Sequence, residues 1–391
     1  MTEVTNRSPR ELRIGCAVFF FISGFGYSSW ASRIPTIQQQ LHLNEAQLGT
    51  LLFALPIGLI ITLPVTGRLL SHYASRSIML IGALLFNVVL LFLGLATQAW
   101  QFAIILFSFG SARNLLNLSV NAQSVGVQSL YKKSVITTFH GIWSLAGFAG
   151  AAVGYLMVKL DVGLTYHLGA ISIFLCGASL YFYQYTFYQK PKPVERKPFL
   201  ILPDKHMLKF AIISFACMAC ENTMYDWSAI YFDKAVHAGK ATATAGFVAY
   251  MVAMTTGRFV GDKLVIRTGI KNLLNCSGWL ILFGLLLAVA LPYPITAGLG
   301  FMLVGLGVSC VVPLVFSIAG KSATLSSGAA IASISTIGYF GFLLVPPFVG
   351  YIAQLAGLRW SFGIISLFGG LIVWMVSKIE LPGPLKGEQK T

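Results

Sequence analysis

Twelve stretches of about twenty apolar residues recur along this 391-residue chain, and each is long enough to cross a bilayer as an α-helix. In hydrocarbon the backbone polar groups must be bonded inside the structure, so this pattern predicts an all-α bundle of membrane helices. The predicted segments are 12–32, 45–67, 77–97, 100–125, 135–158, 164–188, 207–232, 241–262, 272–291, 294–319, 327–355 and 358–377. The connections between them are too short to contain a soluble domain.

The charged residues indicate how the bundle lies in the membrane. Only 10% of the residues are charged, against about 25% in a soluble domain. Of the 27 Lys and Arg residues, 20 lie in the termini and in every second connection between segments, and 5 lie in the remaining connections. The other two, Arg113 and Lys209, lie in or beside the segments. Basic residues favour the cytoplasmic side, so we expect both termini in the cytoplasm of a bacterial cell, with the chain in the inner membrane. The net charge of +15 is therefore explained without a nucleic-acid partner. The lipid bilayer is the expected surrounding.

Weak internal similarity divides the chain into two halves. Gly67-Arg68 recurs as Gly257-Arg258, and Trp30-Ala-Ser recurs as Trp227-Ser-Ala, each in the equivalent helix of the second half. The predicted organisation is a six-helix bundle over 1–188, a cytoplasmic linker over 189–206 and a second six-helix bundle over 207–391. Halves repeated in this way are related by an axis along the membrane normal, and a solute site lies between them near mid-membrane.

Three charged side chains are predicted deep inside the apolar segments: Arg113, Glu221 and Asp226. A charge in hydrocarbon costs several kcal/mol, roughly 2.5–3.5 on insertion scales, so a retained one suggests a functional site. Arg113 shares one face of the fourth segment with Asn117 and Asn121, at i, i+4 and i+8. This stripe predicts a substrate site in which Arg113 binds an anionic group and the amides bind hydroxyls. Alternatively, it holds helices together, with Arg113 neutralised by Glu221.

The seventh segment carries both acidic residues. Five residues correspond to about 140° around a helix, so Glu221 and Asp226 cannot share a face. Glu221 lies nearer mid-depth, where burial favours the protonated carboxyl, and it is the preferred proton-coupling residue; a permanent salt bridge is the alternative. Asp226 is expected to make a structural contact at the outer gate and is the second coupling candidate. His140, near the start of the fifth segment, relays protons or bonds a neighbouring carbonyl.

Several motifs resemble a known family over essentially the whole chain. They are Asn121-Ala-Gln, Phe139-His-Gly-Ile-Trp-Ser-Leu-Ala-Gly147, Glu221-Asn-Thr-Met-Tyr-Asp-Trp-Ser-Ala229 and Gly257-Arg-Phe-Val-Gly-Asp262. With them the chain resembles the major facilitator superfamily of transporters, and within it the YbjJ-like bacterial branch, which is loosely related to fucose-permease-type sugar transporters. The resemblance implies two pseudo-symmetric six-helix bundles whose first, fourth, seventh and tenth helices line a central cavity.

Site residues follow from the resemblance together with the residue patterns. The predicted substrate-binding residues are Arg113, Asn117, Asn121, Tyr27, Trp30 and Tyr225. The predicted gating residues are Gly67, Arg68, Arg76, Gly257, Arg258 and Asp262. Tyr27 and Trp30 share a face of the first segment and would stack on a sugar ring, although aromatic residues near helix ends also anchor proteins at the membrane interface.

Some positions depart from the family pattern. Ser71 replaces the acidic residue of the loop after the second helix, and Asn117 replaces an Asp that relatives carry. Tyr155 stands where the antiporter signature, begun by Gly141, Gly150 and Gly154, requires Pro. Because Ser71 is not acidic, the ion pairs usual at the cytoplasmic corner after the second helix are in doubt.

Together these features predict a secondary active transporter that moves a small polar solute, sugar-like or an organic anion, by alternating access in symport with protons. Proton-driven efflux of an amphipathic compound and a solute receptor that does not transport are the alternatives. The sequence has no phosphate-binding loop of the G-x-x-x-x-G-K-[ST] type, and its six histidines are scattered. We therefore expect no enzyme activity, cofactor or metal, and a monomeric protein.

Overall fold

The computed structural model describes residues 7–133, 135–188, 203–319 and 327–379, and within them the regular elements are helical. Most of the predicted linker, 189–202, lies outside these residues, so the domain boundaries stay a prediction. The helices of the first half are α1 Pro9–Ala31, α2 Ile34–Gln40, α3 Glu45–Leu52, α4 Ala54–His72, α5 Ser75–Leu93, α6 Ala99–Gln128, α7 Ile136–Lys159 and α8 Leu164–Phe182, followed by the 3₁₀ turn Tyr183–Tyr185. Those of the second half are α9 Lys205–Lys234, α10 Lys240–Thr268, α11 Ile270–Ala290, α12 Pro294–Val308, α13 Val311–Ala319, α14 Ser327–Ala356 and α15 Leu358–Ser377.

These helices make up twelve membrane spans in the described part of the chain. Eleven are long and apolar enough to cross a bilayer, when α3 with α4 and α12 with α13 are each taken as one interrupted span. The twelfth is α10, whose 29 residues are sufficient in length but which carries Arg258, Asp262, Lys263 and Arg267 in its second half. The prediction of a twelve-helix membrane protein is confirmed.

Local sequence signals account for several of the helix ends. Asn44 caps the start of α3: its side chain accepts a hydrogen bond from the Gln47 N–H at 2.8 Å, and the Gln47 side chain accepts one from the Asn44 N–H at 3.0 Å. Gly269 and Gly357 adopt φ of 77° and 92°. Because only glycine adopts such angles at little cost, these two residues make the tight turns from α10 to α11 and from α14 to α15.

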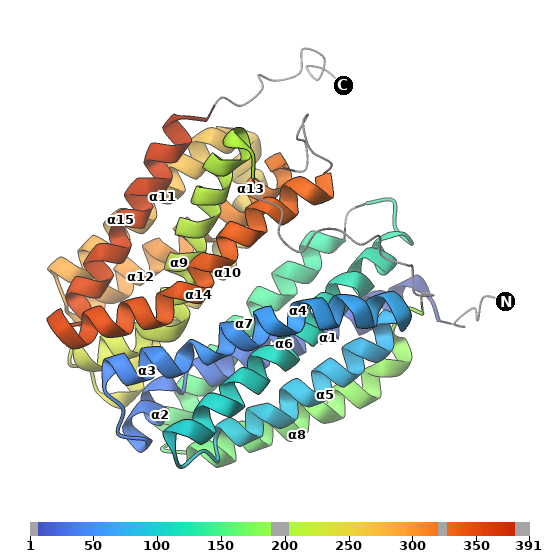
Figure 1. The fold of residues 1–391 in the computed structure, drawn as a ribbon, viewed down its shortest axis with the longest axis horizontal. Helices are drawn as coiled ribbons and strands as arrows, with labels where there is room; N and C mark the ends of the chain where they lie inside the picture. The colour runs from blue at the N-terminus through green and yellow to red at the C-terminus, as the bar shows by residue number, and fades with distance from the viewer. Residues whose placement is uncertain (1–6, 134, 189–202, 320–326, 380–391) are drawn as a thin grey trace.

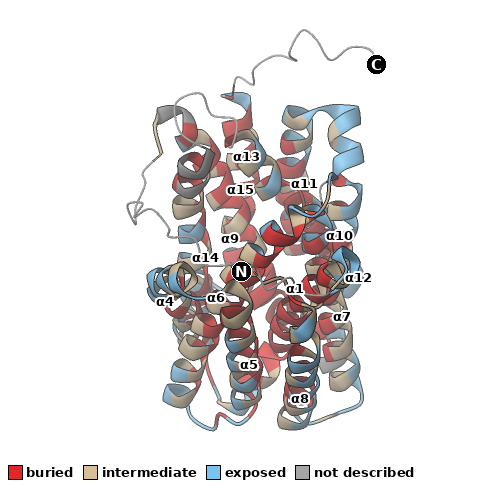
Figure 2. Cartoon of the chain, turned by 90° about the vertical axis from the view of Figure 1, so that its right-hand side faces the viewer, coloured by how far each residue is buried: buried red, intermediate tan, exposed pale blue. Residues whose placement is uncertain are grey.

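The two halves use equivalent helix pairs. In the first half α1 packs along α7, α4 along α6 and α5 along α8; in the second half α9 packs along α14, α10 along α12 and α11 along α15. The arrangement is two pseudo-symmetric six-helix bundles, as predicted. Buried residues face other helices and exposed residues lie on the outward faces (Figure 2). The exposed ones include large apolar side chains such as Ile104, Ile173 and Leu355, as a surface in contact with lipid requires.

The halves meet tightly at one end of the bundle and diverge toward the end where α1 begins and α15 ends (Figure 1). At the closed end α3 packs against α14 so closely that a Cβ on Gly350 would lie 2.6 Å from the Glu45 carbonyl oxygen. The Lys234 ammonium pairs there with the Glu45 carboxylate, and the Gln39 amide donates a hydrogen bond to Asp233 at 3.3 Å. Polar and steric contacts therefore both hold this end shut.

Candidate functional site

Arg113 lies at the middle of α6, where it is 9% exposed. The carbon of its guanidinium group stands 3.8 Å from the centroid of the Tyr27 ring on α1 and 5.6 Å from that of Phe342 on α14. Among the described residues no carboxylate lies within 4 Å of Arg113, and its Nε has no hydrogen-bond partner. Aromatic faces attract a cation, but they do not neutralise its charge. Arg113 is therefore a deep cation that forms no ion pair with the residues described.

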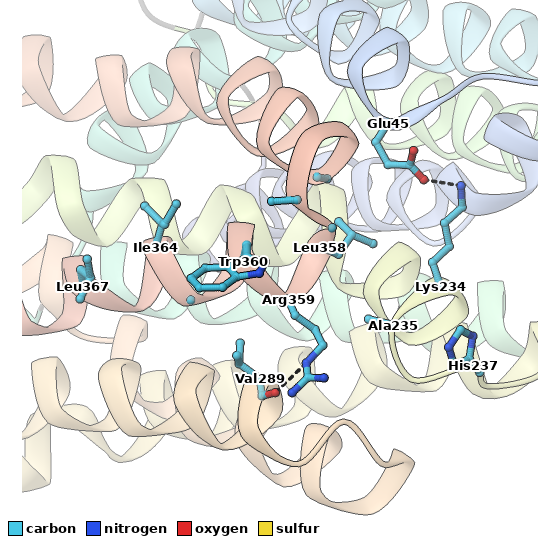
Figure 3. Close-up of a pocket in the computed structure, with 14 residues that line it drawn as sticks. Glu45, Lys234, Ala235, His237, Val289, Leu358, Arg359, Trp360, Ile364 and Leu367 are labelled. Carbon is cyan, nitrogen blue, oxygen red and sulfur yellow. Dashed lines mark hydrogen bonds and ion pairs between the residues drawn. The ribbon is translucent and has the colours of Figure 1, made fainter.

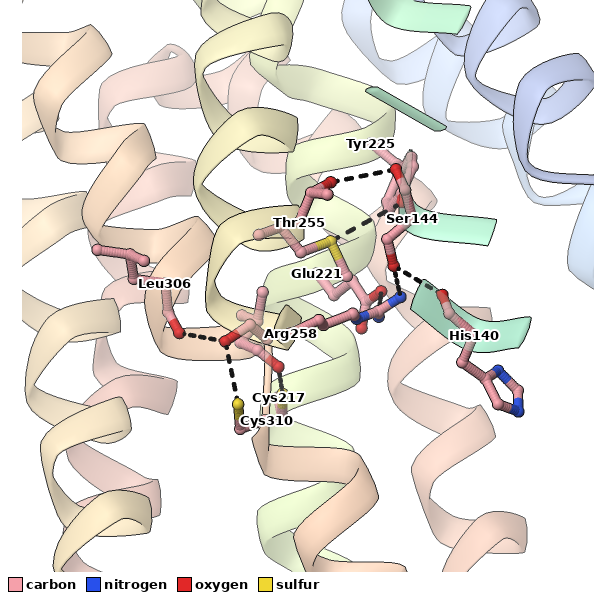
Figure 4. Close-up of polar contacts among 12 residues, drawn as sticks. His140, Ser144, Cys217, Glu221, Tyr225, Thr255, Arg258, Leu306 and Cys310 are labelled. Atoms are coloured by element: carbon pink, nitrogen blue, oxygen red, sulfur yellow. Dashed lines mark hydrogen bonds and ion pairs between the residues drawn. The ribbon is translucent and has the colours of Figure 1, made fainter. Parts of the chain in front are cut away.

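Glu221, on α9, pairs with a different arginine (Figure 4). Its carboxylate lies 3.5 Å from the guanidinium of Arg258 on α10. The same guanidinium donates a 2.6 Å hydrogen bond to Ser144 Oγ on α7 and lies 5.5 Å from the centroid of the Trp143 ring. Because α7 belongs to the first half and α9 and α10 to the second, Arg258 links the two halves. The alternative in which Glu221 neutralises Arg113 is wrong for this conformation.

The position of Arg258 corrects a second expectation. The sequence predicted a helix that ends at 262, which put Arg258 beside the cytoplasmic corner as a gating residue. The helix α10 continues to Thr268, ten residues beyond Arg258 and therefore roughly 15 Å along the axis. Arg258 is thus a fourth charged residue deep in the bundle.

Asp226 and Glu221 contact different neighbours, because they point in different directions around α9. Its Oδ2 accepts a 3.0 Å hydrogen bond from the Asn222 amide, one turn earlier on α9, and the same amide reaches the carbonyl oxygen of Phe342 on α14 at 3.4 Å. Asp226 is 7% exposed, and no cation in the described part of the chain lies within ion-pairing distance of it. Asp226 is therefore a second deep charge, held by a hydrogen bond from an amide and not by an ion pair.

Aromatic rings connect these charges across the two halves. The centroids of Tyr27 on α1 and Tyr225 on α9 are 5.3 Å apart, and the Tyr225 ring also lies against Phe247 and Tyr250 of α10 at 5.5 and 5.9 Å. All four residues are buried. Arg113, Tyr27 and Tyr225, predicted from three separate segments, form one continuous group at the junction of the halves.

The amide stripe continues from Arg113 along α6. Asn117 Oδ1 accepts a 2.7 Å hydrogen bond from Ser23 Oγ of α1, which in turn accepts one from the Trp143 indole at 3.3 Å. Asn121 is exposed, and its amide bonds the Asn117 carbonyl oxygen. Exposure therefore increases from Arg113 to Asn121, toward the end at which the halves diverge.

Two predicted site residues lie away from this group. Trp30 is fully buried inside the first half, with its ring centroid 5.8 Å from that of Phe102 and 6.3 Å from that of Phe109. His140 is exposed, with its ring against Phe20 at 5.3 Å, and its imidazole points away from the Glu221–Arg258 pair in Figure 4. The sequence pattern did not predict which way Trp30 or His140 points, because α1 and α7 both carry apolar residues on more than one face.

The remaining gating candidates are dispersed. Arg68 is exposed, and a Cβ on Gly67 would meet nothing within 4 Å. Arg76 lies over the ring of Tyr188 at 4.7 Å. Asp262 is exposed and makes no ion pair with any residue described.

A Cβ on Gly257 would clash with the Ser309 side chain, so this glycine is a close-packing position.

Sequence reasoning missed three residues that complete the site: Ser144, Asn222 and Phe342. The spacing of Asn222 and Asp226, four residues apart on one helix face, was a usable signal for their pairing. Nothing in the sequence placed Phe342 or Ser144 opposite an arginine. In the described ranges no three His, Cys, Asp or Glu side chains are grouped closely enough to hold a metal ion.

A bundle of two six-helix halves with apolar outward faces is the architecture of a polytopic membrane protein. The sequence profile of the Major Facilitator Superfamily matches residues 16–327 and 211–390, and the chain belongs to this superfamily. It is 30% identical to an uncharacterized MFS-type transporter of Yersinia pestis over 91% of this chain and 92% of the relative, and 31% identical to an uncharacterized transporter of Sinorhizobium fredii over 92% and 95%. The membrane protein MosC of Rhizobium meliloti is 28% identical over 95% and 91%.

Solved structures share the fold. A mutant of the nucleoside transporter NupG superposes with a TM-score of 0.76 at 15% identity, covering 94% of this chain and 99% of that protein. A bacterial homolog of the human lysosomal transporter Spinster, in an inward-facing and occupied conformation, superposes with a TM-score of 0.73 at 12% identity, covering 95% and 97%. Membership of a transporter superfamily favours transport over catalysis as the activity of this chain.

Proposed function

We propose that this protein is a secondary active transporter of a small polar solute that carries an anionic group, and that it works by alternating access with protons as the coupled ion. In this proposal the halves 1–188 and 207–391 rock about the junction that contains Arg113 and Tyr27. The solute binds between them, and the protein acts as a monomer in the bacterial inner membrane.

The observation that carries the proposal is the deep Arg113 guanidinium without a carboxylate partner. A buried charge left uncompensated costs about 3–5 kcal/mol, and a guanidinium forms paired hydrogen bonds with a carboxylate or phosphate. A solute anion would supply the missing charge. Asn117 and Asn121, on the same helix face, would bind hydroxyl or carbonyl groups of the solute.

The charge bias of the connections supports the orientation. Moving Arg258 into the bundle leaves 19 basic residues on the predicted cytoplasmic side against 5 on the other. In this orientation the diverging end faces the cytoplasm, and the contacts of Glu45 and Asp233 close the periplasmic end. The conformation then corresponds to one of the two states that alternating access requires.

Proton coupling is assigned to Glu221, with Asp226 as the second candidate. A proton on Glu221 would remove the charge that holds Arg258, and with it the contact of Arg258 to Ser144 in the other half. In this way protonation would favour rearrangement of the halves. Glu221→Gln mimics the protonated carboxyl, so counterflow exchange in proteoliposomes should persist while uphill uptake under a pH gradient fails. Uphill uptake at the wild-type rate would move the assignment to Asp226.

The test of the solute class starts from purified protein and a thermal-shift screen over organic acids, sugars, amino acids and nucleosides. Nucleosides are included because NupG is described as a nucleoside transporter. An anionic compound should stabilise the wild-type protein and the surface control Arg267→Gln, but not Arg113→Gln. A neutral solute that stabilises Arg113→Gln as strongly as the wild type would contradict the role of Arg113 in anion binding.

A further inference from the structure

A cavity of about 940 Å³ lies in the second half, at the closed end of the bundle. It is bounded by the end of α9, the end of α11, the turn from α14 to α15 and the start of α3 (Figure 3). None of its lining residues belongs to the central group around Arg113 and Glu221. The cavity is therefore a second site, separate from the proposed solute site.

The mouth of the cavity is cationic. The Nε of Arg359 donates a 3.0 Å hydrogen bond to the carbonyl oxygen of Val289, one residue before the end of α11. This bond fixes the side chain beside the cavity and leaves the two terminal nitrogens of the guanidinium without a carboxylate partner among the residues described. Lys234 also lines the mouth, but it is paired with Glu45. The charge left uncompensated at the mouth is that of Arg359.

The wall that leads away from the mouth is apolar. Trp360, Ile364 and Leu367 follow one face of α15, at i, i+4 and i+7, and all three line the cavity. Trp360 is 66% and Leu367 63% exposed. A Cβ on Gly363, between them, would meet nothing within 4 Å, so the groove is open at this point. Because α15 is a membrane span, this wall extends from the interface into the depth of the bilayer.

The order of these groups along α15 matches the order of groups in a lipid molecule. Tryptophan prefers the level of the lipid headgroups, the guanidinium beside it suits a phosphate, and the apolar residues that follow suit an acyl chain. A soluble anion would match the arginine only, and an apolar peptide would match the groove only.

We propose that this cavity binds one anionic phospholipid from the membrane. The headgroup phosphate lies on the free side of the Arg359 guanidinium, and one acyl chain follows α15 past Trp360 to Leu367.

The test uses the purified full-length protein and native mass spectrometry with phosphatidylglycerol or phosphatidylcholine of identical acyl chains. A basic residue near a lipid surface contributes about 1 kcal/mol, which corresponds to about a fivefold change in affinity. Arg359→Gln should therefore weaken phosphatidylglycerol binding about fivefold or more. Lys159→Gln, which removes an exposed cation at the same end of the bundle, should leave it unchanged. Equal binding of both lipids, or equal losses in both variants, would overturn the headgroup assignment.

Two further measurements separate the lipid from other occupants. Phospholipids brominated on the acyl chain quench nearby indole fluorescence, and the quenched fraction should fall in Trp360→Phe relative to the wild type. No difference between them would overturn the path of the acyl chain along α15. Millimolar inorganic phosphate should not displace bound phosphatidylglycerol; if it does, and short-chain phosphatidylglycerol binds no better than phosphate, the cavity is a site for a free anion.

Discussion

The ion pair between Glu221 and Arg258 should be measurable as a coupling energy between the two residues. At 3.5 Å, an effective dielectric constant of about 20 gives a Coulomb attraction of about 5 kcal/mol. Both side chains remain about one-fifth exposed, at 21% and 19%, and desolvation offsets part of the attraction. We therefore expect a coupling energy of about 2–3 kcal/mol.

The assay is a double-mutant cycle on unfolding free energies, measured in detergent micelles with increasing dodecyl sulfate. Glu221→Gln leaves the Arg258 charge unpaired, and Arg258→Gln leaves the Glu221 carboxylate unpaired, so each single variant should be less stable than the wild type. The double variant removes both charges. Its loss of unfolding free energy should therefore be much smaller than the sum of the losses of the two single variants.

A second cycle, between Glu221 and Arg113, is the matched control. These residues make no ion pair in the structure, so their coupling energy should be clearly smaller than that of Glu221 with Arg258. A coupling near zero for Glu221 with Arg258, or a larger one with Arg113, would refute the reasoning and restore the pairing that the sequence suggested.

Two further predictions concern topology and packing. In a cysteine-free background, Lys159→Cys should react with an impermeant thiol reagent added outside intact cells and Lys263→Cys should not; labelling of position 263 alone would reverse the proposed orientation. Gly150→Val should destabilise the protein by about 1–3 kcal/mol, because a Cβ on Gly150 would lie 2.5 Å from a backbone carbonyl oxygen of α1. The control Gly177→Ala, where a Cβ meets nothing within 4 Å, should be neutral or slightly stabilising in the same unfolding assay. Equal effects of the two substitutions would show that the contact between α1 and α7 is not tight.

The sequence was a reliable guide to the membrane spans because hydrophobic length is a local property. All twelve predicted segments overlap helices of the structure, from Pro9–Ala31 to Leu358–Ser377. The boundaries were less accurate where a helix continues beyond the apolar run. In α10 the charged residues Asp262 and Lys263 suggested an end, but charged side chains can extend a helix into the headgroup region and water.

The sequence by itself determined that this chain is a two-part bundle of membrane helices, and that Arg113, Glu221 and Asp226 are costly residues that need a reason to be there. Only the tertiary structure decided their partners. The pairing of Glu221 with Arg258 depends on how α9 packs against α10, and the contact of Arg113 with Tyr27 depends on how α6 packs against α1. A deep charge in hydrocarbon is costly, but that cost does not specify which group lies beside the charge. That choice is made by helix packing, which brings together residues far apart in the sequence.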